Sequence, residues 1–489
     1  MTTTTDVGSV IKFGTDGWRA IIADEFTFDN VRICAQAVSQ YLLDAKRTAK
    51  GVVVGYDTRF GSDRFAEAAA EVLTGNGIAI HFCTRPCPTP VVSFTILDRD
   101  AEFGVMITAS HNPGEYNGFK IKDGNGASAP PEVVEAVEAN IPAIGRGGAG
   151  AIKRMPIKEA EAKGLVKWVD PIPAYDVGVR RVLTDERLAR IKNAGLTVIA
   201  DSMYGAGGGY FRRLLRGGKT RVIELNGKPN PAFPGMHNPE PITQNLGKLM
   251  ARVAQGASVG LATDGDADRL GVVDEHGNFM TQLQVYSLLC LYMLDARGER
   301  GPIVKSITTS SMVYRLGEKY DVPVVETNVG FKYVGAEMIR FNALIGGEES
   351  GGYGFRGHIP ERDGVLAGLY FLDLMVSTGK TPAQLLDYLY SLVGPHYYDR
   401  IDMHFPAAQR PHILGLVTAA QKEISGVGVA KQETVGEGVI EGVRFMMADN
   451  SWLLVRFSGT EPLIRIYAES SSPQRTQQML QAGKGIAGL

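Results

Sequence analysis

Short apolar runs alternate with helix-like segments along most of the chain, and this alternation constrains the fold more than any other feature. Near the amino terminus, the strand-like runs are residues 51–57, 78–82 and 103–107, and helical patterns cover 31–45 and 64–74. Strands that alternate with helices form parallel sheets with crossover helices. The sequence therefore predicts an α/β fold that begins with a parallel sheet.

The same layout recurs twice more. A second segment contains a predicted helix at 175–192 and strands at 196–201 and 259–263, and a third contains strands at 302–306, 322–326 and 343–346. Each segment ends a strand in a polar, glycine-bearing loop, which indicates a threefold internal duplication. The last hundred or so residues differ, with a predicted helix at 406–425 and short strands at 438–445, 451–457 and 463–468, and favour a separate α+β domain.

Composition excludes several classes of function. The chain has 489 residues, 44% of them hydrophobic and 21% charged, and a formal net charge of −2. A broad basic field for nucleic acid or a membrane surface is therefore not expected. The longest apolar stretch, 285–294, is about half of a bilayer crossing, and the threonine-rich start lacks the features of a secretory signal. Cys83 and Cys87 could form a metal clip, but no second pair completes one, so reduced thiols and a cytoplasmic location are expected.

The loop at 108–113, Thr-Ala-Ser-His-Asn-Pro, follows the apolar run 103–107. Open α/β sheets bind ligands at the carboxyl ends of their strands, which is where this loop puts Ser110. A serine so placed can carry a group covalently, with His111 and Lys120 as candidates for moving its proton. The alternative is a turn with a satisfied hydroxyl.

The loop at 264–269, Asp-Gly-Asp-Ala-Asp-Arg, carries three carboxylates at alternate positions. Such crowded negative charge is costly unless a divalent cation lies among the carboxylates, so Asp264, Asp266 and Asp268 predict a Mg²⁺ site. A calcium EF-hand is a rival, but its sixth loop position requires glycine, and here it is Arg269. A solvated acidic turn is the other alternative.

Two further loops carry polar groups suited to a sugar phosphate. Residues 347–354, Gly-Glu-Glu-Ser-Gly-Gly-Tyr-Gly, place acceptors among glycines, and these could receive hydrogen bonds from sugar hydroxyls. Residues 456–462, Arg-Phe-Ser-Gly-Thr-Glu-Pro, followed by Arg465, combine cations, hydroxyls and main-chain N–H groups in a phosphate grip. An acidic surface turn and solvated hairpin arginines are the respective alternatives.

With these four loops, and the turn at 13–19 that ends in Arg19, the chain resembles the α-D-phosphohexomutases, the family of phosphoglucomutases and phosphomannomutases. The resemblance spans nearly the full length. It implies a heart-shaped molecule of three doubly wound α/β/α domains and a smaller α+β lid. We expect the four domains at residues 1–168, 169–278, 279–393 and 394–489.

The resemblance also implies roles for individual residues. Ser110 would be a phosphoserine, and Asp264, Asp266 and Asp268 would hold Mg²⁺ together with an oxygen on Ser110. Lys120, His111 and Arg19 would serve acid–base and charge roles, and Arg269 would lie beside the metal. Sugar contacts are expected from Glu348 and Ser350, less directly from Lys332 and His358, and phosphate contacts from Arg456, Ser458, Gly459, Thr460 and Arg465.

The implied reaction interconverts hexose 1-phosphate and hexose 6-phosphate through a hexose 1,6-bisphosphate, which is both intermediate and activator. Glu349 favours glucose, because mannose/glucose bispecific relatives often carry methionine there and glucosamine-phosphate mutases usually carry glutamine. Mannose, mannose/glucose and glucosamine mutases remain alternatives, as do a Mg²⁺-dependent phosphatase and a non-catalytic sugar-phosphate-binding regulator. The expected partners are small-molecule hexose phosphates, and the protein could be a monomer or a homodimer.

Overall fold

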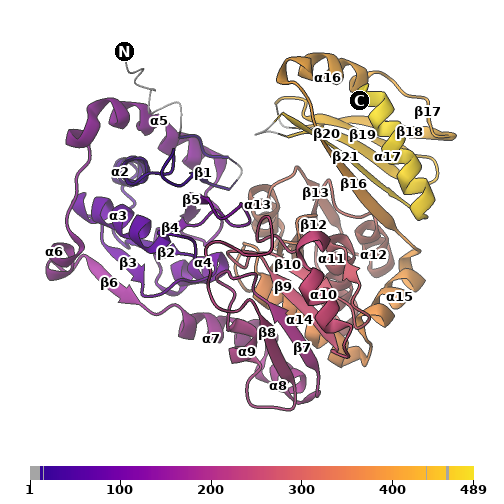
Figure 1. Ribbon diagram of the computed structural model, residues 1–489, viewed down its shortest axis with the longest axis horizontal. Coiled ribbons are helices and arrows are strands. Elements are labelled where there is room, and N and C mark those ends of the chain that lie inside the picture. Colours follow the sequence, from indigo (N-terminus) through magenta and orange to yellow (C-terminus); the bar gives the residue numbers. More distant parts are fainter. Residues whose placement is uncertain (1–10, 15, 437, 459–461) are drawn as a thin grey trace.

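The computed structural model describes residues 11–14, 16–436, 438–458 and 462–489. Four β-sheets follow one another along the chain, each built from one stretch of sequence. In Figure 1 the first and fourth units form two upper lobes, and the second and third units join them below, which gives the heart-shaped outline. The predicted order of three α/β units and one α+β unit is confirmed.

The first sheet has six strands in the order β1-β5-β4-β2-β3-β6. Its strands are β1 (Trp18–Ile21), β2 (Val52–Tyr56), β3 (Ile80–Cys83), β4 (Phe103–Ile107), β5 (Tyr116–Asp123) and β6 (Val166–Val169). One face packs on α2 (Phe28–Asp44), α3 (Ser62–Gly75), α5 (Pro131–Gly147) and α6 (Ile157–Ala162), and the other packs on α4 (Thr89–Asp98). Neither β5 nor α4 is predicted from the sequence, and a short 3₁₀ turn, η1 (Gly148–Ala151), follows α5.

The second sheet has the order β11-β10-β9-β7-β8. Its strands are β7 (Thr197–Asp201), β8 (Arg221–Leu225), β9 (Val259–Thr263), β10 (Leu270–Val273) and β11 (Phe279–Met280), and its helices are α7 (Ile172–Leu183), α8 (Asp185–Asn193), α9 (Tyr210–Leu214), η2 (Thr243–Asn245) and α10 (Gly247–Val253). The helix predicted at 175–192 is two helices, because Thr184 has φ +61° and its hydroxyl accepts a hydrogen bond from the N–H of Arg187, which caps α8.

The third sheet has the order β13-β12-β14-β15. Its strands are β12 (Ile303–Ser306), β13 (Val324–Thr327), β14 (Ile345–Gly347) and β15 (Tyr353–Phe355). Its helices are α11 (Gln282–Leu291), which continues into a π-helical turn η3 (Tyr292–Ala296), then α12 (Met312–Tyr320), α13 (Phe331–Phe341), α14 (Gly364–Thr378) and α15 (Pro382–Val393).

One strand pattern repeats in these three sheets. In spatial order, the neighbouring parallel strands are β4-β2-β3, β9-β7-β8 and β14-β12-β13. In each set, the strand that comes last in the chain (β4, β9 or β14) therefore lies beside the strand that comes first (β2, β7 or β12). An antiparallel strand then follows beside that last strand: β5, β10 and β15. The serine loop (residues 108–113), the metal loop (residues 264–269) and the sugar loop (residues 348–352) are therefore equivalent connections, which supports the predicted duplication.

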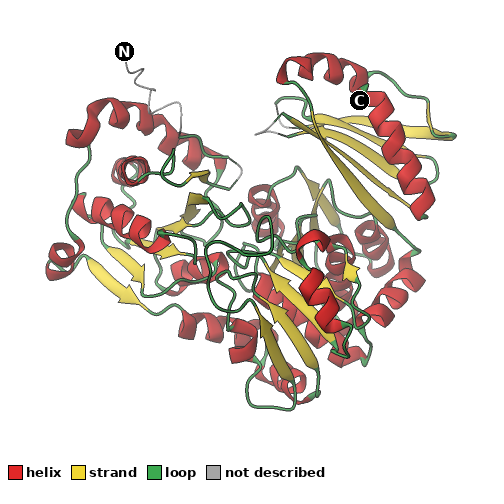
Figure 2. Cartoon of the chain, in the orientation of Figure 1, coloured by secondary structure: helices red, strands yellow, loops and turns green. Residues whose placement is uncertain are grey.

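The fourth sheet is antiparallel throughout, in the order β16-β21-β20-β19-β18-β17. Its strands are β16 (Tyr397–His404), β17 (Glu423–Ile424), β18 (Val427–Val435), β19 (Gly442–Met447), β20 (Trp452–Phe457) and β21 (Leu463–Ser470). η4 (Ala407–Gln409), α16 (Arg410–Thr418) and α17 (Pro473–Ala487) complete the unit, and α16 and α17 cover one face of the sheet (Figure 2). The helix predicted at 406–425 is too long, because the chain leaves α16 after Thr418 to enter β17.

A continuous apolar core connects the first three units. It contains Val92 of α4, Tyr175 of α7, Leu261 of β9 and Phe371 of α14. The fourth unit has a core of its own and packs on the third through a small cluster that includes Ile307 and four buried side chains of the fourth sheet. The three α/β loops are thus held in one packed body, whereas the fourth unit is attached through a smaller contact.

Two strands reach past the expected domain limits. β6 ends at Val169 within the first sheet, and β11 extends the second sheet to Met280. Among the described helices, none is both long and apolar enough to cross a membrane.

Candidate active site

The serine loop (residues 108–113) joins β4 to β5 and leaves Ser110 buried, with a left-handed backbone of φ +52°. Non-glycine residues rarely adopt this conformation, and it is concentrated at functional sites. The Ser110 Oγ donates a hydrogen bond to Oδ2 of Asp264 at 3.0 Å and lies 3.4 Å from Nδ1 of His111. Burial, together with Arg269 and Arg19, lowers the pKa of His111 well below its usual range. A neutral His111 could accept a proton from Ser110.

Arg59 holds the serine loop in place, although the sequence reasoning assigns it no role. Its guanidinium donates hydrogen bonds of 2.5 to 2.9 Å to the carbonyl oxygens of Ser110, Asn112, Pro113 and Tyr116. Asp57 balances the buried charge, with its Oδ2 3.4 Å from Nε of Arg59, and accepts a 2.6 Å bond from Thr108. Because these residues follow β2 as Ser110 follows β4, the rule that ligand sites lie beyond parallel strand ends could have found them.

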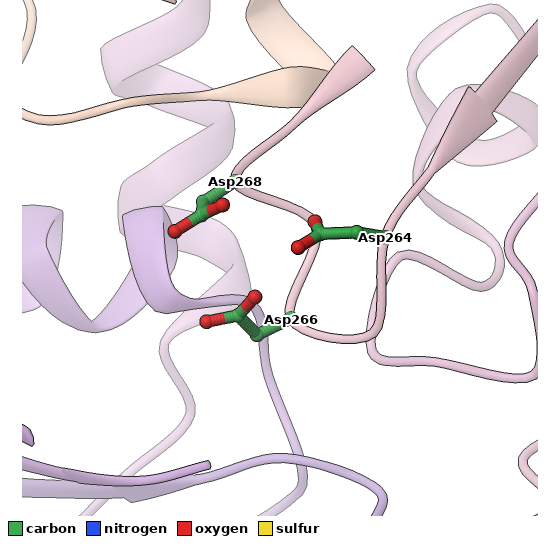
Figure 3. Close-up of side chains that lie close together, drawn as sticks. All are labelled: Asp264, Asp266 and Asp268. Atoms are coloured by element: carbon green, nitrogen blue, oxygen red, sulfur yellow. The ribbon is translucent and has the colours of Figure 1, made fainter. Parts of the chain in front are cut away.

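The metal loop (residues 264–269) joins β9 to β10 and brings its three carboxylates together (Figure 3). Asp264, Asp266 and Asp268 are fully buried and offer ligand atoms that all lie within 4.8 Å of one another. Within the described part of the chain, Oδ1 of Asp266 and Oδ1 of Asp268 have no hydrogen-bond partner. Because unsatisfied buried carboxylate oxygens suit a hard divalent cation, these residues fit the predicted metal. The flanking strands exclude an EF-hand.

Crowding of the carboxylates changes their affinity for protons. Burial, with repulsion from the other two, raises the pKa of Asp264 well above its usual range, and burial raises the pKa of Asp268 to about 6. The pKa of Asp266 is lowered despite burial, because Lys120 lies beside it. A bound cation would relieve this repulsion, so the site is built to hold positive charge.

Lys120 meets the metal loop from β5. Its Nζ lies 2.7 Å from Oδ2 of Asp16, 3.0 Å from Oδ2 of Asp266 and 3.7 Å from Oδ2 of Asp268. Although burial favours the neutral amine, these carboxylates outweigh it and raise the pKa of Lys120. Arg19 completes the cluster with hydrogen bonds to Asn112 Oδ1 at 2.8 Å and to Asp16 at 3.4 Å.

Arg362 connects this cluster to the sugar loop (residues 348–352), and the sequence reasoning also assigns it no role. Its Nη2 lies 2.9 Å from Oδ2 of Asp16 and 2.8 Å from Oδ2 of Asp268. Its Nη1 lies 3.9 Å from Oε2 of Glu348. Because Arg362 precedes α14 in the third unit, one buried guanidinium ties together groups from the first three units.

The sugar loop joins β14 to β15, and its backbone bonds to the start of β10, directly after the metal loop. The N–H of Leu270 donates to the carbonyl of Gly351 at 2.9 Å. Burial raises the pKa of Glu348 to about 7, although Arg362 opposes the shift. The Ser350 hydroxyl lies 3.5 Å from Glu348 Oε2, so both predicted sugar contacts share one small turn.

Three predicted residues have other neighbours. Arg269 donates its main-chain N–H to Asp264 and pairs through Nη1 with Glu240 at 2.9 Å, which keeps it beside the metal loop as expected. His358 lies 2.9 Å from Asp363 and stacks on Phe94 in the packing between units. Nζ of Lys332 lies 5.0 Å from the ring centroid of Tyr333. The roles of Lys332 and His358 stay predictions.

The predicted phosphate grip lies on β20 and β21. Arg456 and Arg465 are directly opposite in the strand register. The Arg456 guanidinium is held by Glu441 Oε2 at 2.8 and 3.0 Å, and the main-chain N–H of Ser458 donates to Leu463. Gly459 and Thr460 lie outside the described residues.

Family models recognise every unit of the chain. The phosphoglucomutase/phosphomannomutase alpha/beta/alpha domain I matches residues 10–146, domain II residues 179–277 and domain III residues 283–393, and the C-terminal domain of the same family matches residues 416–482. The chain belongs to the phosphoglucomutase/phosphomannomutase family. It is an isomerase of the phosphohexomutase type, so the family prediction is confirmed.

Curated relatives match over nearly the whole chain. A phosphoglucomutase/phosphomannomutase from Thermococcus kodakarensis is 31% identical over 473 residues, covering 96% of this chain and 97% of its own. A protein from Methanothermobacter thermautotrophicus, named a probable phosphoglucosamine mutase, is 32% identical over 477 residues and 97% of each chain.

Solved structures show the same fold. One from Thermus thermophilus, provisionally described as a phosphomannomutase, has a TM-score of 0.81 and 34% identity, covering 98% of this chain and 99% of its own. An Aspergillus fumigatus N-acetylphosphoglucosamine mutase, in complex with GlcNAc-6P and magnesium, is more distant, with a TM-score of 0.54 and 15% identity over 99% of this chain and 97% of that chain.

Proposed function

We propose that this phosphohexomutase interconverts glucose 1-phosphate and glucose 6-phosphate through a phosphoserine at Ser110 and a glucose 1,6-bisphosphate intermediate. One observation carries the proposal. Ser110 Oγ lies 3.0 Å from a carboxylate of the buried triad, so a phosphoryl group on that oxygen would lie beside the metal ligands. The triad would hold Mg²⁺, which would stabilise the negative charge on the transferring phosphoryl group.

Charge determines which other residues are needed. A phosphoserine carries about −1.5 to −2 charges, so a second phosphate can approach only where cations lie close by. Lys120, Arg362 and Arg19 supply them, and Arg19 and Arg362 share Asp16 with Lys120. Phosphoryl transfer depends mainly on placement and charge stabilisation, which suits this arrangement.

Each transfer also moves a proton. When a sugar hydroxyl takes the phosphoryl group, that hydroxyl loses its proton and Ser110 Oγ gains one. When Ser110 takes the phosphoryl group from the sugar, the neutral imidazole of His111, favoured by its lowered pKa, would accept the serine proton. The ammonium of Lys120, favoured by its raised pKa, would donate a proton to the leaving sugar oxygen and stabilise charge. In the opposite transfer, Lys120 would accept the proton of the attacking sugar hydroxyl, and His111 would return its proton to Ser110 Oγ.

Binding at both ends of the sugar completes the scheme. Glu348 and Ser350 would accept or share hydrogen bonds with the central hydroxyls, and Arg456, Ser458 and Arg465, with Gly459 and Thr460, would clasp the phosphate that is not transferred. The bisphosphate would then turn and return its other phosphoryl group to Ser110. Because these residues would contact only the phosphate, they would bind the bisphosphate in either of its two orientations.

The sugar preference is inferred from the sequence pattern around the sugar loop. Relatives of nearly equal identity carry glucose/mannose and glucosamine names, and Glu349 favours glucose. Mannose and glucosamine phosphates are the competing substrates, because an enzyme discriminates weakly between sugars that differ at one position when it makes no hydrogen bond to the group at that position.

Intact mass and peptide mapping test the proposal. We expect one phosphoryl group on Ser110 that exchanges with labelled glucose 6-phosphate, and we expect Ser110→Ala to abolish interconversion while keeping the wild-type melting temperature. A panel of glucose, mannose and glucosamine phosphates assigns the sugar. Release of inorganic phosphate without the isomeric sugar phosphate would indicate a phosphatase, and full activity of Ser110→Ala would refute the serine mechanism.

A further inference from the structure

Glu349 lies between the two predicted sugar contacts, Glu348 and Ser350, but its carboxylate contacts the fourth unit. Its Oε1 accepts a 3.0 Å hydrogen bond from the hydroxyl of Tyr398 and a 2.7 Å hydrogen bond from Nη1 of Arg400. Both donors lie on β16, the first strand of the fourth unit. The sugar loop is therefore connected directly to the unit that carries the phosphate grip.

The contact continues across the fourth sheet. Nε of Arg400 lies 2.9 Å from Oδ1 of Asp402, and Oδ2 of Asp402 lies 3.5 Å from Nε of Arg465. Asp402 and Arg465 are directly opposite in the β16–β21 register. We call the series Glu349–Arg400–Asp402–Arg465 the ion-pair chain. It leads from the sugar loop to one of the two arginines of the phosphate grip.

Strand geometry explains why these residues align. Side chains alternate between the two faces of a strand, so Arg400 and Asp402 share a face of β16 and Asp399 lies on the other. Asp399 accepts a 2.6 Å hydrogen bond from Gln477 of α17. Arg400 can pair with two carboxylates because its planar guanidinium presents Nη1 to Glu349 and Nε to Asp402.

We propose that the ion-pair chain positions the Arg465 guanidinium relative to the sugar loop, so that the two ends of a hexose phosphate are held in register. This inference rests on the proposed function, because it takes Arg465 as a phosphate contact and Glu348 as a sugar contact. Glu349, Arg400 and Asp402 act through Arg465 and are positioning residues. If any ion pair of the chain is lost, the Arg465 guanidinium keeps its charge but can adopt other orientations.

Steady-state kinetics of Glu349→Gln and Asp402→Asn test the inference at low salt. The three links are partly exposed, so we expect each variant to raise the KM for glucose 1-phosphate by about two- to five-fold while kcat changes less. Asp399→Asn is the matched control, because it removes the same charge from the opposite face of the same strand. Arg400→Lys keeps the charge without the fork and should give an intermediate KM.

A double-mutant cycle tests whether Glu349 and Asp402 act together through the ion-pair chain or affect KM independently. If the chain acts as a unit, Glu349→Gln/Asp402→Asn raises KM by less than the product of the single effects. Single variants with the KM of Asp399→Asn would overturn the inference, as would effects that multiply fully. Melting temperatures equal to that of Asp399→Asn confirm that the fold is intact.

The proposed function has a separate readout in the same experiment. If the wild-type protein does not interconvert glucose phosphates, the proposed function fails. If the wild type is active and the chain variants behave as the control does, only the ion-pair chain is rejected. Binding of inorganic phosphate, measured by calorimetry, should also weaken in Asp402→Asn and not in Asp399→Asn.

Discussion

Single side chains hold the active loops by satisfying main-chain groups. Ser110 has a strained backbone, and such conformations persist only where the surroundings over-determine them. Arg59 provides this restraint with four charge-assisted hydrogen bonds to carbonyl oxygens. One guanidinium therefore sets the direction in which the serine hydroxyl points.

We expect Arg59→Lys to lower kcat by about ten- to a hundred-fold, because an ammonium cannot reach all four carbonyl oxygens and each lost bond to a charged donor costs about 1.5–3 kcal/mol in stability of the loop. The measurements are kcat, KM and the phosphoryl occupancy of Ser110 by mass spectrometry. Arg64→Lys, on the exposed side of α3, is the control. Wild-type kcat in Arg59→Lys would contradict this role.

At the scale of elements, the serine and metal loops touch with no room to spare. A Cβ added at Gly265 would lie 2.3 Å from the carbonyl oxygen of Ser110, about 1 Å closer than ordinary packing contacts. Because Gly265 has no side chain, the loops that follow β4 and β9 can pack directly against each other.

Gly265→Ala should separate the two loops by about 1 Å and lower kcat/KM by about a hundred-fold, because catalysis is sensitive to displacements of that size. Steady-state kinetics and Mg²⁺ titration by calorimetry would measure the loss. Gly247→Ala at the start of α10, where an added Cβ meets no atom within 4 Å, should leave both values unchanged. An active Gly265→Ala protein would show that the loops tolerate separation.

At the scale of the whole molecule, the fourth unit depends on polar contacts with the third. Glu326 of β13 lies 2.8 Å from Nζ of Lys305 and 2.7 Å from the guanidinium of Arg444 on β19. Burial opposes ionisation, but Lys305 and Arg444 outweigh it and lower the pKa of Glu326 to about 2. Because its folded pKa is depressed, Glu326 stabilises the protein above its ordinary value near 4.5, and this contribution is lost as the pH falls toward 2.

We expect Glu326→Gln to lower the free energy of unfolding by about 3 kcal/mol at pH 7, from the size of the pKa shift. The deficit relative to wild type should shrink between pH 4.5 and pH 2, and urea unfolding at several pH values would follow it. Glu318→Gln, an exposed change on α12, is the control. A deficit that is independent of pH would mean that Glu326 contributes through packing and not through charge.

How much of the site could be predicted depended on where its residues lie in the sequence. Ser110, the three aspartates and Glu348 stand in short polar runs that interrupt apolar strands, and this pattern is visible without a structure. The sequence indicates Lys120 as a candidate but does not indicate its strand β5, because Asn117 and Gly118 are residue types typical of turns. Arg59 lies just beyond β2, where the rule on strand ends applies, whereas Arg362 has no local pattern of its own.

The sequence by itself determined the classes of units, their order and the chemistry of the four loops, because strand and helix periodicity and loop composition are local properties. Only the tertiary structure decided that Arg362 joins groups from three units and that Glu349 reaches Arg400. Those contacts join residues far apart in the chain. The first depends on the packed core that brings three equivalent strand ends together, and the second depends on the apolar cluster that attaches the fourth unit to the third.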